Sequence, residues 1–288
     1  MSNYCGISPI YSNVPSTPVI SNNRAVLMEY WKKYLTQRAM SVYKWTMPSL
    51  WSENYFKYIL YGIGYITVLY TGAYGWIPQR CALGGLNLFE EPDRIIVNNP
   101  LVYGIDRRIG EGNVVFTFNA DYTGVQDIID YYAMQLAELS MTAYANMVGT
   151  KISHVFGVDN KKTADAMSKI IDQILNGEPA VVAKTTKAGE AIDYFGQDVK
   201  RTYIVSDILI DMRKILNDFN TCFGIPNANT EKKERLITDE VNANNSETKL
   251  LPELWLNNFK ATCEQLNSIA GENLMSVDWA DELKKEGD

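Results

Sequence analysis

The sequence predicts an α+β chain that is mainly helical, with a small β-rich part and an α/β insertion between two long helices. Three observations predict this. Apolar residues recur at helical spacing in several stretches, and short β-type runs broken by Gly, Pro and Asn occupy residues 63–118. A compact mixed segment separates the two strongest helical patterns. With 46% apolar and 21% charged residues among 288, the composition is that of a globular protein.

Charge and composition exclude several kinds of protein. The net charge of −7 gives no bulk attraction to nucleic acid, so any DNA contact must come from a local basic patch. The cysteines lack C-x-x-C spacing, which is typical of reduced thiols, and the single histidine, His154, is too little for a His-based metal site or a catalytic triad. The P-loop pattern G-x-x-x-x-G-K-[ST] does not occur. We therefore expect no cofactor, no metal and no enzymatic activity.

Two segments bear on targeting. Residues 1–23 carry no charged side chain and are rich in Ser, Asn and Pro, which predicts a flexible N-terminal arm without the basic start of a secretory leader. Residues 58–77 are 20 residues without a charge, long enough to span a bilayer. Their many tyrosines and glycines favour strand-like pieces instead. A membrane pore is thus a weaker alternative, and no membrane contact is expected.

The first elements follow in order. Apolar spacing predicts a helix over residues 24–46, closed by Pro48, and a shorter helix over 51–60. The β-type runs are Tyr65–Tyr70, Tyr74–Cys81, Arg94–Val97 and Val114–Phe118.

Residues 121–148 give the clearest helical pattern, with Asp121 or Thr123 as cap and Gly149 at the end. No Lys or Arg occurs between Arg108 and Lys151. The polar positions are nearly all acidic: Asp121, Asp127, Asp130 and Glu138. An ordinary solvated face explains such a stripe. The acids could also bind Mg²⁺ in a nucleic-acid enzyme, as could Asp239 with Glu240, but no third convergent ligand is apparent.

The rest of the chain reads as an insertion, two helices and a polar segment. Residues 152–204 predict a compact α/β insertion, with a helix over 161–176 and strands at Ala180–Lys184 and Thr202–Val205. A long helix over 206–223 follows, capped by Ser206 and ended by Gly224. Residues 226–247 are polar and unusually long for a loop. A third helix over 252–270 has Pro252 in its first turn, and a loose tail follows Trp279.

The polar segment carries a resemblance to a known family. The run Asn227-Ala228-Asn229, Glu231-Lys232-Lys233-Glu234-Arg235, Thr238-Asp239-Glu240-Val241 resembles the tunnel loop of the connector proteins of small short-tailed Bacillus phages. In that family the run likewise follows a long helix that ends in Gly. Tyr43-Lys44-Trp45 and the aromatic and glycine-rich residues 55–85 are similar to the family's first helix and wing. The similarity covers about residues 24–270.

The resemblance implies a portal protein, also called connector or upper collar, in which about twelve copies close into a ring. It implies that the fold consists of a helical stem, a small β-rich (SH3-like) wing and an α/β clip. The implied parts are the arm 1–23, wing 24–120, stem helices 121–151 and 205–225, clip 152–204, tunnel loop 226–247, wing or crown-side helix 248–272 and tail 273–288.

The implied function is to conduct DNA into the capsid during packaging and out of it during ejection, and to join head to tail. The implied partners are viral double-stranded DNA, a packaging ATPase, a lower collar or tail protein, the capsid protein and its scaffold. The protein would lie in the virion neck at the unique capsid vertex, and in the host cytoplasm during assembly. Another neck or adaptor ring protein is the nearest alternative.

The resemblance also implies roles for individual residues. Lys232, Lys233 and Arg235 would touch DNA from the tunnel loop, as rings of positive charge at a single level of the channel. In the stem, Asp127, Asp130 and Glu138 would give an acidic channel wall. Binding of a packaging RNA by the arm is left open, because residues 1–23 contain no Lys or Arg. The clip would contact its partners through a separate basic set: Lys161, Lys162, Lys184, Lys187, Lys200 and Arg201.

Overall fold

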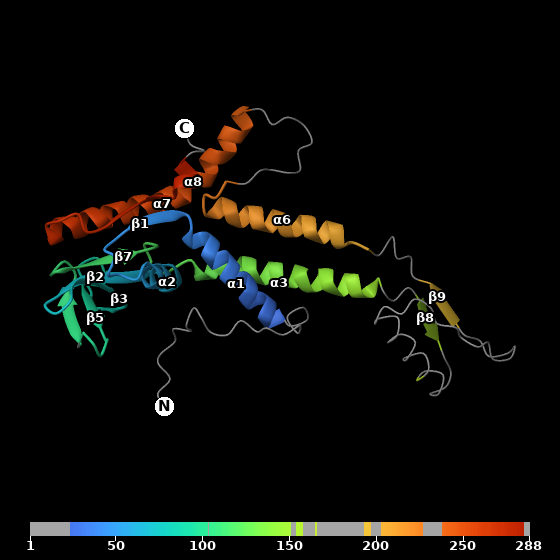
Figure 1. Ribbon diagram of the computed structural model, residues 1–288, viewed down its shortest axis with the longest axis horizontal. Coiled ribbons are helices and arrows are strands. Elements are labelled where there is room, and N and C mark those ends of the chain that lie inside the picture. The colour runs from blue at the N-terminus through green and yellow to red at the C-terminus, as the bar shows by residue number, and fades with distance from the viewer. Residues whose placement is uncertain are drawn as a thin grey trace. The chain divides into compact units, whose positions relative to one another are not determined.

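A computed structural model describes residues 24–102, 104–150, 154–157, 165, 193–196, 203–226 and 238–284 (Figure 1). Predictions for the arm 1–23, for most of the clip 152–204 and for residues 227–237 lie outside the described residues. The chain divides into a larger unit, residues 31–133 and 215–288, and a smaller unit, residues 1–30 and 134–214. The structure mixes helices with sheets, and the predicted α+β class is confirmed.

The elements are named as in Figure 1. The helices are α1 (Arg24–Met40), α2 (Glu53–Ile63), α3 (Gln126–Gly149), α6 (Val205–Cys222), α7 (Thr238–Ala270) and α8 (Asp281–Lys284). The strands are β1 (Tyr43–Thr46), β2 (Tyr65–Thr71), β3 (Gly75–Gln79), β4 (Ala82–Gly84), β5 (Arg94–Val97), β6 (Ile105–Arg108), β7 (Asn113–Thr117), β8 (His154–Gly157), β9 (Asp193–Gly196) and β10 (Ser276–Trp279).

Two three-stranded antiparallel sheets form the β-rich part of the larger unit. Their strand orders are β3-β2-β7 and β4-β5-β6. A shared apolar cluster of Leu69, Cys81, Ile95 and Val97 joins the two sheets, because it takes side chains from both. The predicted β-type runs correspond to β2, β3, β5 and β7, whereas the short strands β4 and β6 were not predicted.

An aromatic core holds the long C-terminal helix on the sheet. Trp45 packs on Phe56 and Phe259 with ring centroids 5.0 and 5.2 Å apart, and Phe118 packs on Trp255 at 4.9 Å. The amide nitrogen of the Asn258 side chain, on α7, donates to the carbonyl oxygen of Thr117 at 2.9 Å. Offset and edge-on ring contacts of this kind add to the free energy gained by burial.

The predicted helix over residues 24–46 is too long. It ends at Met40, and Tyr43–Thr46 form β1, which pairs with β10 so that Tyr43 faces Trp279. Burial alternates along β1, with Tyr43 and Trp45 inside, which is the two-residue period of a strand. Beyond β10, part of the tail predicted to be loose after Trp279 is ordered: Asp281–Lys284 form α8, and Lys44 forms a 2.6 Å ion pair with Asp281.

The predicted helix over 121–148 begins late, at Gln126. Asp121 does not cap it, because its carboxylate accepts hydrogen bonds from the amide and the hydroxyl of Thr123 in a preceding turn. Tyr122 in that turn has a φ of 61°. The predicted end at Gly149 is confirmed.

The predicted bounds of the polar loop, 226–247, and of the following helix, from 248 or 252, are also wrong. Helix α7 begins at Thr238, so Pro252 lies inside it rather than in its first turn. A proline inside a helix removes one backbone hydrogen bond. Here tertiary contacts hold it: the Tyr43 hydroxyl donates to the Pro252 carbonyl oxygen at 2.6 Å. Gly224, with a φ of 69°, approaches the Pro252 ring so closely that a Cβ there would lie 3.0 Å from it.

Helix α6 confirms the predicted apolar face, with Ile208, Phe219 and Phe223 buried. It begins at Val205, so the strand predicted over Thr202–Val205 is wrong at that residue. In the smaller unit β8 and β9 pair antiparallel.

Residues 58–77 do not form one long helix. They run from the end of α2 through β2 into β3. In the described part of the chain, every helix is too short or too polar to cross a bilayer.

Candidate functional site

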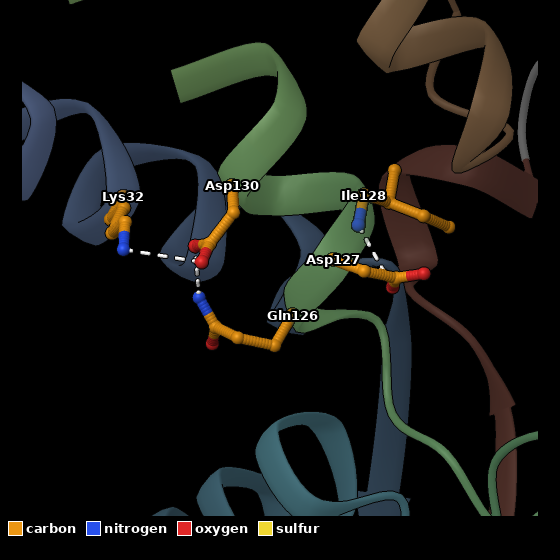
Figure 2. A network of polar contacts seen from close by, with 5 residues as sticks. All are labelled: Lys32, Gln126, Asp127, Ile128 and Asp130. Atoms are coloured by element: carbon orange, nitrogen blue, oxygen red, sulfur yellow. Dashed lines mark hydrogen bonds and ion pairs between the residues drawn. The ribbon is translucent and has the colours of Figure 1, made fainter. Parts of the chain in front are cut away.

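Helix α3 carries the three acids predicted for a channel wall, and the structure gives each of them a different environment. Asp130 belongs to a polar network at the first turns of α3 (Figure 2). One carboxylate oxygen accepts from the Gln126 side-chain amide at 2.6 Å, and the other pairs with the Lys32 ammonium at 3.2 Å. Lys32 lies on α1, and its side chain is three-quarters buried. Asp130 is therefore a neutralised, partly buried contact between α1 and α3.

Asp127 lies three residues before Asp130, about one helical turn, and its side chain points away from the Lys32–Asp130 pair (Figure 2). Its carboxylate accepts a 2.8 Å hydrogen bond from the amide of Ile128. A carboxylate in the first turn of a helix interacts favourably with the helix dipole. Among the described residues, no Lys or Arg forms an ion pair with Asp127, so no side chain there neutralises its negative charge.

Glu138 lies further along α3 in the smaller unit. Its carboxylate forms an ion pair with the guanidinium of Arg24, the first residue of α1. More than half of the Arg24 side chain is exposed, so the pair contributes little to stability, although it lowers the local negative charge.

Sequence reasoning did not find these two cations. Arg24 and Lys32 lie 114 and 98 positions before the acids that they pair with. The sequence pattern that could have indicated these pairs is the presence of basic residues in the first predicted helix, which could complement the acidic residues of the predicted helix over 121–148. The acidic character of α3 is thus concentrated at Asp127.

The other predicted site residues lie outside the described residues. This holds for the tunnel-loop cations Lys232, Lys233 and Arg235, which fall between the end of α6 and the start of α7. It holds also for the clip cations Lys161, Lys162, Lys184, Lys187, Lys200 and Arg201. Their roles stay predictions.

The described residues contain no cluster of metal ligands. No group of three or more His, Cys, Asp or Glu side chains in this part of the chain could hold a metal ion. Burial raises the pKa of the Cys81 and Cys263 thiols to about 12, which keeps both protonated and poor nucleophiles.

Comparison with known proteins gives a family match over nearly the whole chain and similarity to solved structures. The model of the Phage Connector (GP10) family matches residues 11–284. Among solved structures, the chain is similar to one in the portal and tail of native bacteriophage P68, at 14% identity and a TM-score of 0.44, covering 91% of both chains. It is also similar to a chain in the virion of a native gene transfer agent particle, at 10% identity and a TM-score of 0.44, covering 93% of this chain and 84% of that one.

Proposed function

The chain belongs to the phage connector family and so is a connector, or portal, subunit of the phage particle, and from this premise we propose that about twelve copies close into a ring that conducts viral double-stranded DNA during packaging and ejection. The observation that carries the proposal is the family match over residues 11–284, which includes both long helices, the β-rich part and α7. Such a ring is a structural component of the virion, located where head and tail join.

We assign the parts of the chain to this ring with the bounds of the observed elements. The two sheets with α1, α2 and α7 form the wing, with its SH3-like β part, and α3 and α6 form the stem. Residues 152–204 form the clip, and the tunnel loop is limited to residues 226–237 because α7 begins at Thr238.

In the stem, the wall charge comes from Asp127 rather than from three acids equally. A polyanion must slide past this wall, and a wall that bound phosphate tightly would retard it. With about twelve copies, each Asp127 contributes to one ring of negative charge. Asp130 contributes less, because Lys32 neutralises it, and Glu138 is similarly reduced by Arg24.

The cations of the tunnel loop have the opposite role. Lys232, Lys233 and Arg235 would form positive rings at one level of the channel and hold DNA transiently, with a strength that falls as the salt concentration rises. The clip cations Lys161, Lys162, Lys184, Lys187, Lys200 and Arg201 would contact the packaging ATPase and later the lower collar or tail protein. The wing would contact the capsid protein and its scaffold.

The ring itself has no catalytic step, and the packaging ATPase is a separate protein. A nuclease assay with a Mg²⁺ titration separates this proposal from a metal-dependent nucleic-acid enzyme, because a connector gives no cleavage at any Mg²⁺ concentration.

Electron microscopy of the purified protein tests the proposal directly. We expect closed rings with a central opening and a single cyclic symmetry. Particles that are only monomers or two-fold dimers, under conditions that include the salt and protein concentrations of assembly, would contradict it.

A further inference from the structure

The loop between β4 and β5, residues 85–93, exposes large apolar side chains. Leu86 is 69% exposed, Leu88 is 90% exposed and Phe89 is 77% exposed. We call these three residues the apolar tip. A single exposed leucine is ordinary on a protein surface, but three large apolar side chains within four positions of one loop indicate a contact with another surface.

Hydrogen bonds hold the backbone that carries the apolar tip. The side-chain oxygen of Asn87 accepts from the amides of Phe89 at 2.8 Å and Glu91 at 3.0 Å, and the backbone amide of Asn87 donates to the Glu91 carbonyl oxygen at 2.8 Å. Glu90 has a φ of 62°, a left-handed conformation that residues other than glycine rarely adopt and that is found most often at functional sites. The tip is thus ordered before it meets a partner, which lowers the entropic cost of binding.

The loop and the strands that follow it carry an excess of negative charge. Residues 85–112 contain five acids and three bases, a net charge of −2. Two of the bases are engaged within the chain, because Arg94 pairs with Asp106 at 2.9 Å and Arg107 donates to the Tyr70 carbonyl oxygen at 2.8 Å. Glu90, next to the tip, is exposed and forms no ion pair with a described residue. A complementary surface is therefore apolar with Lys or Arg beside it.

A second copy of this chain is a poor match for that description. In the described part of the larger unit, five cations are already paired with acids of the same chain: Lys32, Lys44, Lys57, Arg94 and Lys260. Each copy also carries a net charge of −7, so the acidic loop would approach a negatively charged neighbour. Charge complementarity thus favours a different protein, one with cations to offer.

We propose that the apolar tip of each copy docks into an apolar pocket bordered by Lys or Arg on the capsid protein, and so attaches the ring to the shell. The inference rests on the proposed function, in which the β-rich part belongs to the wing and the wing contacts the capsid protein. It adds the residues and the chemistry of that contact: Leu88 and Phe89 are buried in the pocket, and Glu90 lies beside its cations.

Substitution of the tip tests the apolar part of the contact. Leu88→Asp combined with Phe89→Asp should leave thermal unfolding and ring formation unchanged, because both side chains are exposed in the single chain and the tip is not used between copies. When the variant is produced together with the capsid protein and the scaffold, the fraction of purified heads that contain a ring should fall at least about tenfold.

The matched control is Leu101→Asp. Leu101 is 73% exposed and lies between β5 and β6, at the other end of β5 from the tip. Rings of this variant should enter heads like the parent.

A charge reversal tests the border of the pocket. Glu90→Lys keeps the length of the side chain and its backbone conformation, but it places a cation beside the proposed cations. It should lower the fraction of heads with a ring at least about threefold. Heads that contain as many rings as with the parent would overturn the basic border.

Photo-cross-linking identifies the partner. A benzoylphenylalanine in place of Phe89 should give, on irradiation of assembled heads, a product that contains this chain and the capsid protein. The same group in place of Leu101 should give no such product. A product with a second copy of this chain, with the scaffold or with a tail protein would overturn the proposal.

The outcomes separate this inference from the proposed function. If the parent chain forms no rings, the proposed function fails. If the parent forms rings that enter heads and the Leu88→Asp, Phe89→Asp variant does so equally well, only the role of the tip is wrong. If the variant loses ring formation itself, the tip lies between copies, and the docking on the capsid protein is likewise refuted.

Discussion

The carbonyl oxygen of Gly64 accepts a 2.6 Å hydrogen bond from the amide of Phe118, where the end of α2 meets the end of β7. Gly64 has a φ of 106°, and a Cβ there would overlap the backbone of Thr123. One step further on, the amide of Val125 donates to the carbonyl oxygen of Tyr61 at 2.9 Å. These contacts fix the point at which α3 begins.

Gly64→Ala should lower the free energy of unfolding of the larger unit by more than about 3 kcal/mol, because it combines a left-handed backbone with a backbone overlap. Gly62→Ala, in the interior of α2 two residues earlier, is the matched control. A Cβ at Gly62 meets nothing within 4 Å, so this change should be neutral or stabilise by about 0.5–1 kcal/mol. Chemical denaturation of both variants gives the comparison, and equal effects would contradict the close approach at Gly64.

The Lys32–Asp130 pair should give a measurable coupling between α1 and α3. In a double-mutant cycle with Lys32→Met and Asp130→Asn, we expect a coupling free energy of about 0.5–1 kcal/mol, since the pair is only partly buried. The coupling should fall as salt is raised from 0.05 to about 0.5 M. A cycle between Lys33 and Asp130 is the control, and a coupling there as large as at Lys32 would contradict the network.

The buried thiols should make stability fall at high pH. The pKa of Cys81 and of Cys263 is about 12 in the folded chain, against an ordinary value of 9.0. Above pH 9 the unfolded chain therefore loses protons that the folded chain keeps, so the free energy of unfolding falls as the pH rises toward 12, and below pH 9 this contribution is constant.

Cys81→Ala with Cys263→Ala should make the decrease in Tm between pH 9 and about 10.5 shallower. The buried phenols of Tyr43 and Tyr61, whose pKa values burial also raises, leave part of the decrease in place. Measurement of the same variant at pH 7 gives the cost of the two small cavities separately. An unchanged slope above pH 9 would mean that the thiols ionise in the folded chain.

Replacement of Lys232, Lys233 and Arg235 by Ala should leave rings intact and impair retention of DNA during or after packaging, because the variant lacks the positive charges that we propose hold DNA. The control variant has Lys184, Lys187 and Lys200 replaced by Ala, which removes the same amount of positive charge from the proposed clip. That variant should fail earlier, in docking of the packaging ATPase. Packaged DNA protected from nuclease, measured over time, separates the two. Full retention by the loop variant would refute the role of the loop.

Local patterns in the sequence were sufficient for several elements. The ends of α3, α6 and α7 lie at or within two residues of Gly149, Gly224 and Gly271. Glycine favours helix ends because its backbone can turn so that the last carbonyl groups of the helix are hydrogen-bonded. The apolar spacing in α6 identified its buried face, and the family resemblance identified the protein class that the family match confirms.

What could not be predicted depends on contacts between residues far apart in the chain. Residues 43–46 have a helical apolar spacing with what precedes them, but pairing with Ser276–Trp279 makes them a strand. The position of Pro252 predicted the start of a helix, but contacts with Tyr43 and Gly224 hold this proline inside α7. The partner of Asp130 could not be found either, because nothing in the local pattern of α3 points to Lys32.

The pairing of β1 with β10 determines when the larger unit can complete its folding during translation. Thr46 and its partner Ser276 are 230 residues apart, so β1 leaves the exit tunnel long before its neighbour has been translated. Helices α3 and α6 are made in that interval. The larger unit, which needs both strands, can therefore be completed only when synthesis of the chain is nearly finished.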